Sequence, residues 1–331
     1  MLFVGLWLSW RKYSDKIGLV TDWTKKWTEK DVRGSTAMQR ITLAGRLGRV
    51  PKALLTAENL LMADVGGKTI IHNAAWNGQL NKIPEAVLTE HILVADREGN
   101  TPLHLAAAWG HLLTVPKSLL TAKNMRTPNF TGKTPLHAAA NNGYLDHLPI
   151  SILTAENLTA KSYTGSTPLH LAANNGFLNQ VPRHVLLGTN LLIPDDFGNT
   201  PLHGAASGFA LGSVVHLHQV PVSVLTSENM TLRNKDGWTP IHYSANTGNL
   251  KQIPMSVLTA ENLLLADKSG RTPLLIAVEQ ECLEQVPLGL EFPDSVRNIV
   301  GEEWWAKNQA VLADKAQLEK DVDDGSEIDV F

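Results

Sequence analysis

Short apolar stretches recur along the chain at a nearly constant interval, and a threonine opens each one. One copy reads Thr101-Pro102-Leu103-His104, and the spacing between copies is 33 residues apart from one interval of 32 and one of 39. The opening threonines are Thr36, Thr69, Thr101, Thr134, Thr167, Thr200, Thr239 and Thr272. A period of this size predicts a solenoid of eight stacked units, from about Asp31 to about Leu290.

The first part of each unit predicts a short helix. A proline such as Pro102 suits the first helical position, because its φ is already helical and its missing N–H costs no hydrogen bond there. The preceding threonine is then the N-cap. A glycine about nine residues later, such as Gly110, predicts a left-handed helix end, and the paired alanines Ala106-Ala107 let a neighbouring helix approach closely. Such a helix is stable only when it is stacked on others.

The second part of each unit contains a proline where a longer helix would otherwise run. These prolines are Pro51, Pro84, Pro116, Pro149, Pro182, Pro221, Pro254 and Pro287. A proline inside a helix costs about 3 kcal/mol, so we expect a broken or shifted second helix in every unit. In the stretch Leu55–Leu60, Thr56 resembles an N-cap that opens one more helical turn. The six extra residues of the long interval, around 210–215, should bulge into solvent.

The repeated phrase resembles the ankyrin repeat. Besides Thr-Pro-Leu-His, the resemblance includes the Ala-Ala pair with its glycine and a preceding Asp-x-x-Gly-x turn, as in Asp64 to Lys68. It covers roughly four fifths of the chain and implies an all-α, ankyrin-type helical solenoid with β-turn fingers, which works by binding other proteins. The proline in the second part marks a divergent subgroup.

The resemblance also implies where a protein partner would bind, namely at the finger tips and at the exposed positions of the first helix, which line the concave side. The matching finger residues are Val65, Arg97, Glu98, Phe130, Tyr163, Phe197, Lys235 and Trp238. The matching helix positions are Trp76, Asn77, Trp109, Asn141, Asn142, Asn174, Asn175 and Thr247. Aromatic and amide side chains are common at interface hot spots. The alternative is that the tryptophans fill gaps between helices and the tip aromatics pack on the adjacent finger.

The two ends of the chain are not repeat-like, and we divide the chain into residues 1–30, 31–290, 291–320 and 321–331. The apolar start, residues 1–10, is interpreted as a packed cap, a docking segment or a secretory signal. Acids followed by apolar residues at Trp304, Val311 and Leu318 predict an amphipathic helix that covers the last repeat and ends near Lys320. Residues 321–331 are an acidic tail, for which we expect disorder.

Three readings of function follow from this organisation. The first is a non-enzymatic scaffold that binds an unknown protein partner through its repeats. The tail ends in Glu327–Phe331, which resembles the peptide that docks on the bacterial replication sliding clamp, so a second reading is a ligand or inhibitor of such a replication factor. A third reading is a membrane-associated adaptor that uses residues 1–10.

Composition and spacing argue against other classes. The chain is 43% hydrophobic and 18% charged with a net charge of −3, and no apolar run reaches 18 residues, so we expect no membrane span. Residues 36–290 are nearly neutral, which does not favour nucleic-acid binding by the repeats. We expect no metal site, because the six repeat histidines would lie in a row about 10 Å apart. We expect no catalytic residues, cofactor or small-molecule substrate, because no nucleophile lies in a recognisable elbow and no paired carboxylates recur. The solitary Cys282 suggests a buried hydrophobe, and we expect a cytoplasmic protein.

Overall fold

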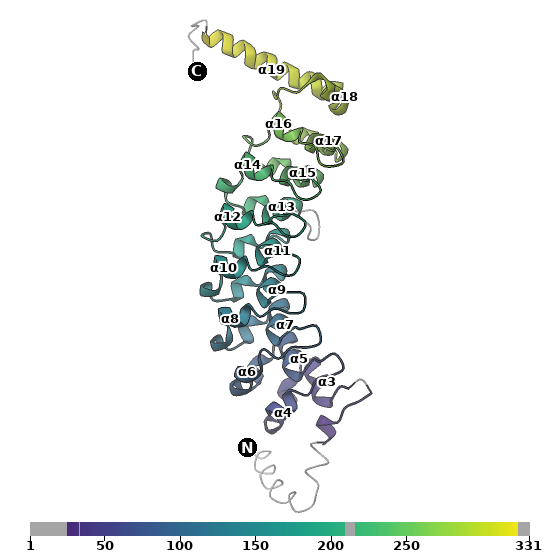
Figure 1. Ribbon diagram of the computed structural model, residues 1–331, viewed down its shortest axis with the longest axis vertical. Coiled ribbons are helices and arrows are strands. Elements are labelled where there is room, and N and C mark those ends of the chain that lie inside the picture. Colours follow the sequence, from purple (N-terminus) through teal and green to yellow (C-terminus); the bar gives the residue numbers. More distant parts are fainter. Residues whose placement is uncertain (1–24, 33, 209–215, 324–331) are drawn as a thin grey trace, which may run out of the picture. The chain divides into compact units, whose positions relative to one another are not determined.

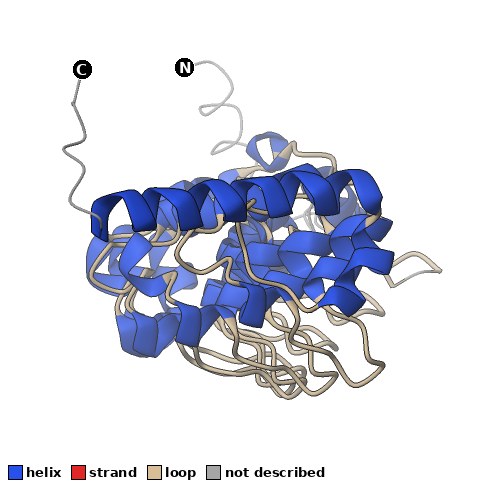
Figure 2. Ribbon diagram, turned by 90° about the horizontal axis from the view of Figure 1, so that it is seen from above, coloured by secondary structure: helices blue, strands red, loops and turns tan. Residues whose placement is uncertain are grey.

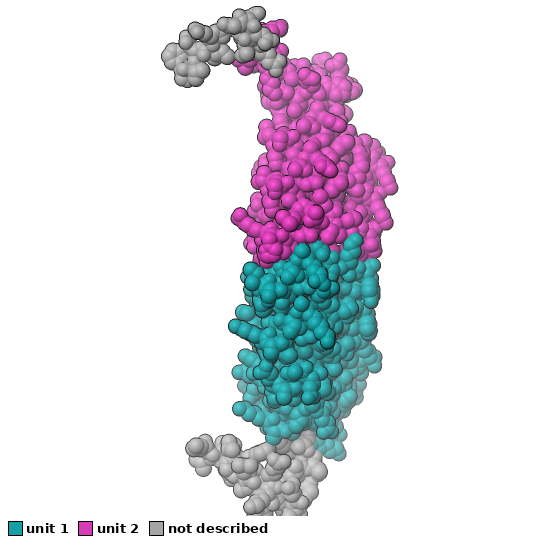
Figure 3. Space-filling model, turned by 60° about the vertical axis from the view of Figure 1, so that its left-hand side comes forward, with its two compact units in different colours: residues 1–163 teal, residues 164–331 magenta. Residues whose placement is uncertain are grey.

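The computed structural model describes residues 25–32, 34–208 and 216–323. The chain forms two compact units, Met1–Tyr163 and Thr164–Phe331, which are coloured separately in Figure 3. Each unit contains four of the eight repeats. Within the described residues the chain is helical: Figure 2 shows helices joined by loops and no strand, and an isolated bridge joins Lys30 to Thr36.

In unit 1 the first helices of the four repeats form one row and the later short helices form a second row (Figure 1). The first row is α3 (Ala37–Leu43), α5 (Ile70–Trp76), α7 (Pro102–Ala108) and α9 (Pro135–Asn142). The second row is α4 (Ala57–Leu60), α6 (Glu85–His91), α8 (Ala122–Met125) and α10 (Ala155–Leu158). The connecting 3₁₀ turns are Leu47–Arg49, Lys52–Leu54, Leu80–Lys82, Leu112–Thr114, Lys117–Leu119, Leu145–His147 and Ile150–Ile152.

Unit 2 repeats the arrangement and adds two helices after the last repeat. Its first helices are α11 (Pro168–Asn174), α13 (Pro201–Ser207), α15 (Pro240–Asn246) and α17 (Pro273–Glu279). The later helices are α12 (Gly188–Leu191), α14 (Ser227–Met230), α16 (Ala260–Leu263), α18 (Arg297–Val300) and α19 (Glu302–Asp323). The 3₁₀ turns are Leu178–Gln180, Leu217–Gln219, Val222–Val224, Leu250–Gln252, Leu283–Gln285 and Asp294–Val296.

The start of each first helix confirms the capping prediction. Thr134, for example, has an extended backbone, and its hydroxyl accepts a hydrogen bond from the amide of His137, while Pro135 occupies the first helical turn. The side chain of His137 accepts in return from the Thr134 amide, at 3.1 Å. The threonine and the histidine therefore satisfy each other's exposed helix-start amides in a reciprocal capping box.

The first helices stack on one another within each unit. Helix α5 contacts α3 and α7, and α7 contacts α9; in unit 2, α13 contacts α11 and α15, and α15 contacts α17. The paired alanines, such as Ala106 and Ala107, are fully buried, as is the leucine that follows each proline. Small side chains at these positions let the helices approach closely, as the sequence predicts, so the core consists of the surfaces between neighbouring repeats.

In several repeats the glycine that ends the first helix has a second role besides its left-handed backbone. Gly110 has a φ of 75°, and the ring of Tyr144, from the next repeat, lies so close that an added Cβ would be 2.7 Å from it. His111 lies over Gly78 in the same way. A side chain at such a glycine would therefore strain the backbone and also push the next repeat away.

The proline of the second part separates two short segments, which confirms the predicted break. Pro116 has a φ of −53° and a ψ of 133°, the polyproline conformation, and a 3₁₀ turn follows it. Helix α8 then begins at Ala122, with Thr121 as its N-cap. The side-chain amide of Asn124 donates to the carbonyl of Leu119 at 2.8 Å. This asparagine thus bonds a carbonyl that the break leaves without a helical partner.

The repeat that begins at Thr69 differs, because it is the one that has lost a residue. Here a single helix, α6, follows Pro84 directly and runs over Glu85–His91. The amide of Ile92 donates to the carbonyl of Leu88 at 2.8 Å, an ordinary helical bond. One fewer residue removes the room for a second N-cap, so the two short segments become one continuous helix that begins after the proline.

Helix α19 docks through a face that overlaps the predicted stripe of Trp304, Val311 and Leu318. The Trp304 ring lies 6.0 Å from that of Phe292, and Val311 lies against Gly289. Leu318 is 58% exposed, whereas Trp305 and Asn308, outside the stripe, are buried. The side chain of Asn308 accepts from the amide of Gly289 at 2.7 Å and donates to the carbonyl of Leu290. The sequence misses Asn308 because an asparagine that bonds backbone groups does not appear in an apolar pattern.

Several sequence predictions concern residues outside the described ranges. These are the apolar start within residues 1–24, the extra residues 209–215 and the end of the tail at 324–331. The division of the chain at residues 30, 290 and 320 also stays a prediction, although α19 itself extends to Asp323.

Candidate functional site

Most fingers are turns that an aspartate or asparagine side chain holds closed; in the finger before Thr167 the position is Ser162. In the third repeat the Asp96 carboxylate accepts from the amides of Glu98 and Asn100, both at 2.9 Å. Adjacent fingers are joined by backbone bonds: the amide of Arg97 donates to Gly66 at 3.0 Å and that of Phe130 to Glu98 at 3.1 Å. The fingers within a unit therefore form an ordered row, and the residues at their tips are held at fixed positions.

The tips of unit 1 present large side chains to solvent. Phe130 is 69% exposed and Tyr163 is 72% exposed, and Val65 and Arg97 occupy the same position of their fingers and are also exposed. The two rings are nevertheless supported from below. An added Cβ at Gly132 would lie 2.6 Å from the Tyr163 ring, and one at Gly99 would lie 2.7 Å from the Phe130 ring. Each ring thus packs one side on the preceding finger and leaves most of its surface open.

The predicted finger residues of unit 2 are less uniform. Phe197 and Lys235 are exposed, whereas Trp238 is half-buried. The Trp238 ring packs on Tyr243, with 4.9 Å between ring centroids, and the Arg271 guanidinium lies 6.0 Å from its centroid. Trp238 precedes the capping threonine, so it lies at the base of its finger and contacts its own repeat and the next.

The two tryptophans of the first helices lie against each other. The ring centroids of Trp76 and Trp109 are 4.3 Å apart, and the rings are tilted by 35°. Trp76 is 36% exposed and Trp109 is 48% exposed. They come from α5 and from the C-cap of α7, so the pair bridges two repeats. The rings fill the space between neighbouring helices and also form an exposed apolar surface, and their role in partner binding stays a prediction.

Most of the predicted asparagines bond to the backbone. Asn77 donates to the carbonyls of Thr42 and Leu43 in the preceding repeat, at 3.2 and 3.1 Å. Asn142 and Asn175 each donate to a carbonyl four residues earlier, in their own helices. The other predicted helix positions are the exposed Asn141 and the half-buried Asn174 and Thr247. Asn174 fills the space that a side chain at Gly204 would need.

The repeat histidines are structural, as the sequence predicts. In His104 the Nδ1 atom accepts from the amide of Thr101 at 3.0 Å, so Nε2 carries the proton and donates to the carbonyl of Lys133, also at 3.0 Å. Burial lowers the pKa of His104 and of His203 to about 4, although their backbone bonds act in the opposite direction. The neutral ring thus joins each helix start to the finger of the following repeat.

The ends of the repeat series lack this histidine. In the first repeat Gln39 replaces it, accepting from the amide of Thr36 at 2.7 Å and donating to the carbonyl of Lys68 at 3.1 Å. In the last repeat the position is Leu275, and no further finger follows. Within the described residues no three histidine, cysteine or acidic side chains converge in a metal-sized cluster. Cys282 is buried, and burial raises the pKa of its thiol.

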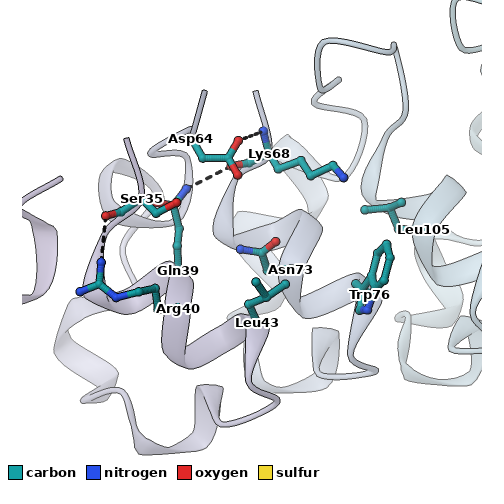
Figure 4. A pocket seen from close by; sticks show the side chains of 9 residues that line it. All are labelled: Ser35, Gln39, Arg40, Leu43, Asp64, Lys68, Asn73, Trp76 and Leu105. Atoms are coloured by element: carbon teal, nitrogen blue, oxygen red, sulfur yellow. Dashed lines mark hydrogen bonds between the residues drawn. The ribbon is translucent and has the colours of Figure 1, made fainter. Parts of the chain in front are cut away.

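A shallow pocket of about 260 Å³ lies on the finger side of the first three repeats (Figure 4). We call it the groove, and its lining residues are Ser35, Gln39, Arg40, Leu43, Asp64, Lys68, Asn73, Trp76 and Leu105. Among these, sequence reasoning had singled out Trp76. The others stand at the third, fourth and seventh positions after the threonine and at the base of the finger. Asn73 and Leu105 are buried, so a search for exposed helix positions does not find them.

Comparison with known families agrees with this architecture. The model for ankyrin repeats (3 copies) matches residues 85–153, and the model for a single ankyrin repeat matches residues 164–196. The chain therefore contains ankyrin repeats between residues 85 and 196, and ankyrin repeats are protein–protein interaction modules. No curated protein matches the chain. In the part of the chain that the structure describes, no helix has both the length and the apolarity that crossing a bilayer requires.

Proposed function

We propose that the protein is a non-enzymatic scaffold that binds a protein partner through the finger tips and the exposed faces of the first helices, the concave side in this family. The observation that carries the proposal is the set of exposed rings in unit 1: the Trp76–Trp109 pair on the helices and Phe130 and Tyr163 on the fingers. We define these four residues as the recognition surface. Rigid aromatic side chains give a large contact area at a small entropy cost.

The backbone supports the proposal because it fixes these rings before a partner arrives. The amide of Tyr163 donates to Thr131 at 3.1 Å, which aligns its finger with the preceding one. A surface that is ordered in the free protein loses little conformational entropy on binding. We also propose that the protein acts in the cytoplasm, where the buried thiol of Cys282 would stay reduced. The alternatives that use residues 1–10 or 327–331 concern parts of the chain outside the described ranges.

The test is capture of partners from lysates of the native host, with identification of the captured proteins. Trp109→Ala and Tyr163→Ala should each weaken capture by about tenfold or more, because each removes a hot-spot ring. Leu113→Ala is the matched control, because Leu113 is 73% exposed but lies outside the recognition surface, in a 3₁₀ turn. Thermal unfolding should change little in all three variants.

Two results would count against the proposal. Capture that Leu113→Ala weakens as much as Trp109→Ala would show that the rings have no special role. A large loss of thermal stability in Trp109→Ala and Tyr163→Ala would assign the two rings to the packing between repeats instead of to partner binding.

A further inference from the structure

The groove combines an apolar floor with a basic rim. The floor is Leu43, Trp76 and Leu105, from the successive helices α3, α5 and α7, and Figure 4 shows these side chains along one side of the groove. The rim carries Arg40 and Lys68. A volume of about 260 Å³ lies below the usual range for small-molecule sites, roughly 300–1,000 Å³, so the groove suits one or two side chains of a peptide better than a cofactor.

Of the two cationic side chains at the rim, Arg40 pairs with a carboxylate of the described residues and Lys68 does not. Asp64 accepts from the amides of Gly66 and Lys68, at 2.8 and 2.9 Å, so its carboxylate holds the finger closed. Arg40 pairs with Asp31 at 2.6 Å. The Nζ atom of Lys68 lies 5.8 Å from the Trp76 ring centroid, and among the described residues no carboxylate is within ion-pair distance of it. A carboxylate next to an apolar side chain would therefore fit the groove.

The chain itself carries such a segment. Residues 1–163 contain 19 Lys and Arg against 12 Asp and Glu, a net charge of +7, whereas residues 164–331 contain 10 against 20, a net charge of −10. The acidic half includes Glu327-Ile328-Asp329-Val330-Phe331, where carboxylates alternate with apolar side chains. The opposite charges of the two halves would attract one copy of the protein to another.

We propose that the tail of one copy, residues 324–331, binds in the groove of a second copy. Phe331 and Val330 would lie on the floor formed by Leu43, Trp76 and Leu105, and Lys68 would pair with the tail's carboxylates. Eight extended residues span at most about 28 Å, enough to cross three helices that are packed about 10 Å apart. We take a second copy as the occupant because the half that carries the groove has a net charge of +7 and the half that carries the tail has a net charge of −10, so two copies attract each other. The proposal rests on the proposed function, since Trp76 belongs to the recognition surface.

The first experiment measures self-association. Sedimentation velocity of the full chain over a range of concentrations should show association that weakens as salt is added, because the contact is largely electrostatic. A chain that lacks residues 327–331 should stay monomeric under the same conditions. A monomer at every concentration, or a concentration-independent compaction that requires the tail, would overturn the proposal, because the latter would place the tail in the groove of its own chain.

The second experiment locates the contact. A fluorescent peptide of residues 321–331 should bind the chain that lacks 327–331, and Lys68→Glu should weaken this binding by about tenfold or more. Lys133→Glu is the matched control, because Lys133 is exposed at the same finger position but lies outside the groove, and its effect should stay below about threefold. Phe331→Ala in the peptide should also weaken binding about tenfold. Circular dichroism would confirm that both protein variants fold.

The outcomes separate this proposal from the proposed function. Equal effects of Lys68→Glu and Lys133→Glu, or tighter binding of a single-stranded oligonucleotide than of the peptide, would overturn the tail contact. If the peptide fails to bind while Trp109→Ala still weakens partner capture, the tail contact alone is wrong. If the peptide binds through Lys68 while Trp109→Ala and Tyr163→Ala leave capture unchanged, the proposed function alone is wrong.

Discussion

A left-handed residue other than glycine ends α17. Glu281 has a φ of 54°, at the position where the seven earlier repeats carry a left-handed glycine. In those repeats the glycine often supports a ring from the following repeat, as Gly78 supports His111. No further repeat follows α17, so a Cβ can be accommodated there and only the backbone strain remains. Such strain costs about 1–2 kcal/mol for a residue with a Cβ.

Replacing this residue should therefore stabilise the protein. We expect Glu281→Gly to raise the free energy of unfolding by about 0.5–1 kcal/mol, because relief of the strain exceeds the entropy that a glycine adds to the unfolded chain. Chemical denaturation monitored by circular dichroism would measure the change. Gly110→Ala is the comparison, and it should destabilise the protein because its φ is 75° and Tyr144 occupies the space. A destabilised Glu281→Gly would show that the glutamate side chain contributes more than the strain costs.

At the scale of the element, the second part of the repeat replaces one helix by two short segments and a bridging asparagine. In the fourth repeat Asn157 is buried, and its side chain donates to the carbonyl of Ile152 at 2.7 Å. The same bond recurs from Asn190 to Val185 and from Asn262 to Val257. Helix α6 has no such bridge, because its carbonyls bond within the continuous helix. The proline breaks the helix, and the asparagine side chain bonds a carbonyl next to the break.

Removing the bridge should cost stability. Asn157→Ala removes one of the two hydrogen bonds to the carbonyl of Ile152, which keeps its bond from the amide of Thr154 at 2.9 Å. We expect a loss of about 1 kcal/mol in the free energy of unfolding. Asn142→Ala should cost less than about 0.5 kcal/mol, because Asn142 is exposed and bonds only within its own helix. Urea denaturation of both variants would measure the difference, and equal losses would argue against the bridging role.

Much of the repeat could be predicted from the sequence, because its main constraints are local. Threonine caps, prolines at helix starts and left-handed glycines act within a few residues, so a single copy reveals them and the period repeats them. The contacts that sequence reasoning missed depend on groups far apart in the chain. Nothing near Asn308 indicates that it will bond to Gly289 and Leu290, and the stacking of Trp76 on Trp109 depends on how two repeats meet. The recognition residues stay a prediction for the same reason.

At the scale of the whole molecule, the neutral histidines make stability depend on pH. Burial lowers the pKa of His104 and His203 to about 4, and it also lowers the pKa of His72 and His242. The unfolded chain, with ordinary values near 6.5, binds protons that the folded chain excludes. The stabilisation is therefore complete above pH 6.5 and is lost as the pH falls toward 4, with a slope of up to about 1.4 kcal/mol per pH unit for each such histidine.

We expect the free energy of unfolding to fall steeply between pH 7 and pH 5. His104→Gln should reduce the slope of the free energy of unfolding against pH by the contribution of one histidine. The fold should be preserved, because Gln39 makes the same pair of bonds in the first repeat. Denaturant unfolding at several pH values would measure both slopes. If the free energy of unfolding is constant over this window, or if His104→Gln leaves the slope unchanged, then the histidine binds protons equally in the folded and unfolded states, and the prediction is wrong.

Leu275 has a consequence for where further modules could be inserted. A histidine at this position would donate to the finger of a following module, as His104 donates to the carbonyl of Lys133, but leucine has no polar atom to offer. A module added after α17 would therefore lack a hydrogen bond that the earlier junctions contain. Anyone who lengthens the protein by inserting modules should place them before α17, where each junction is already chemically complete.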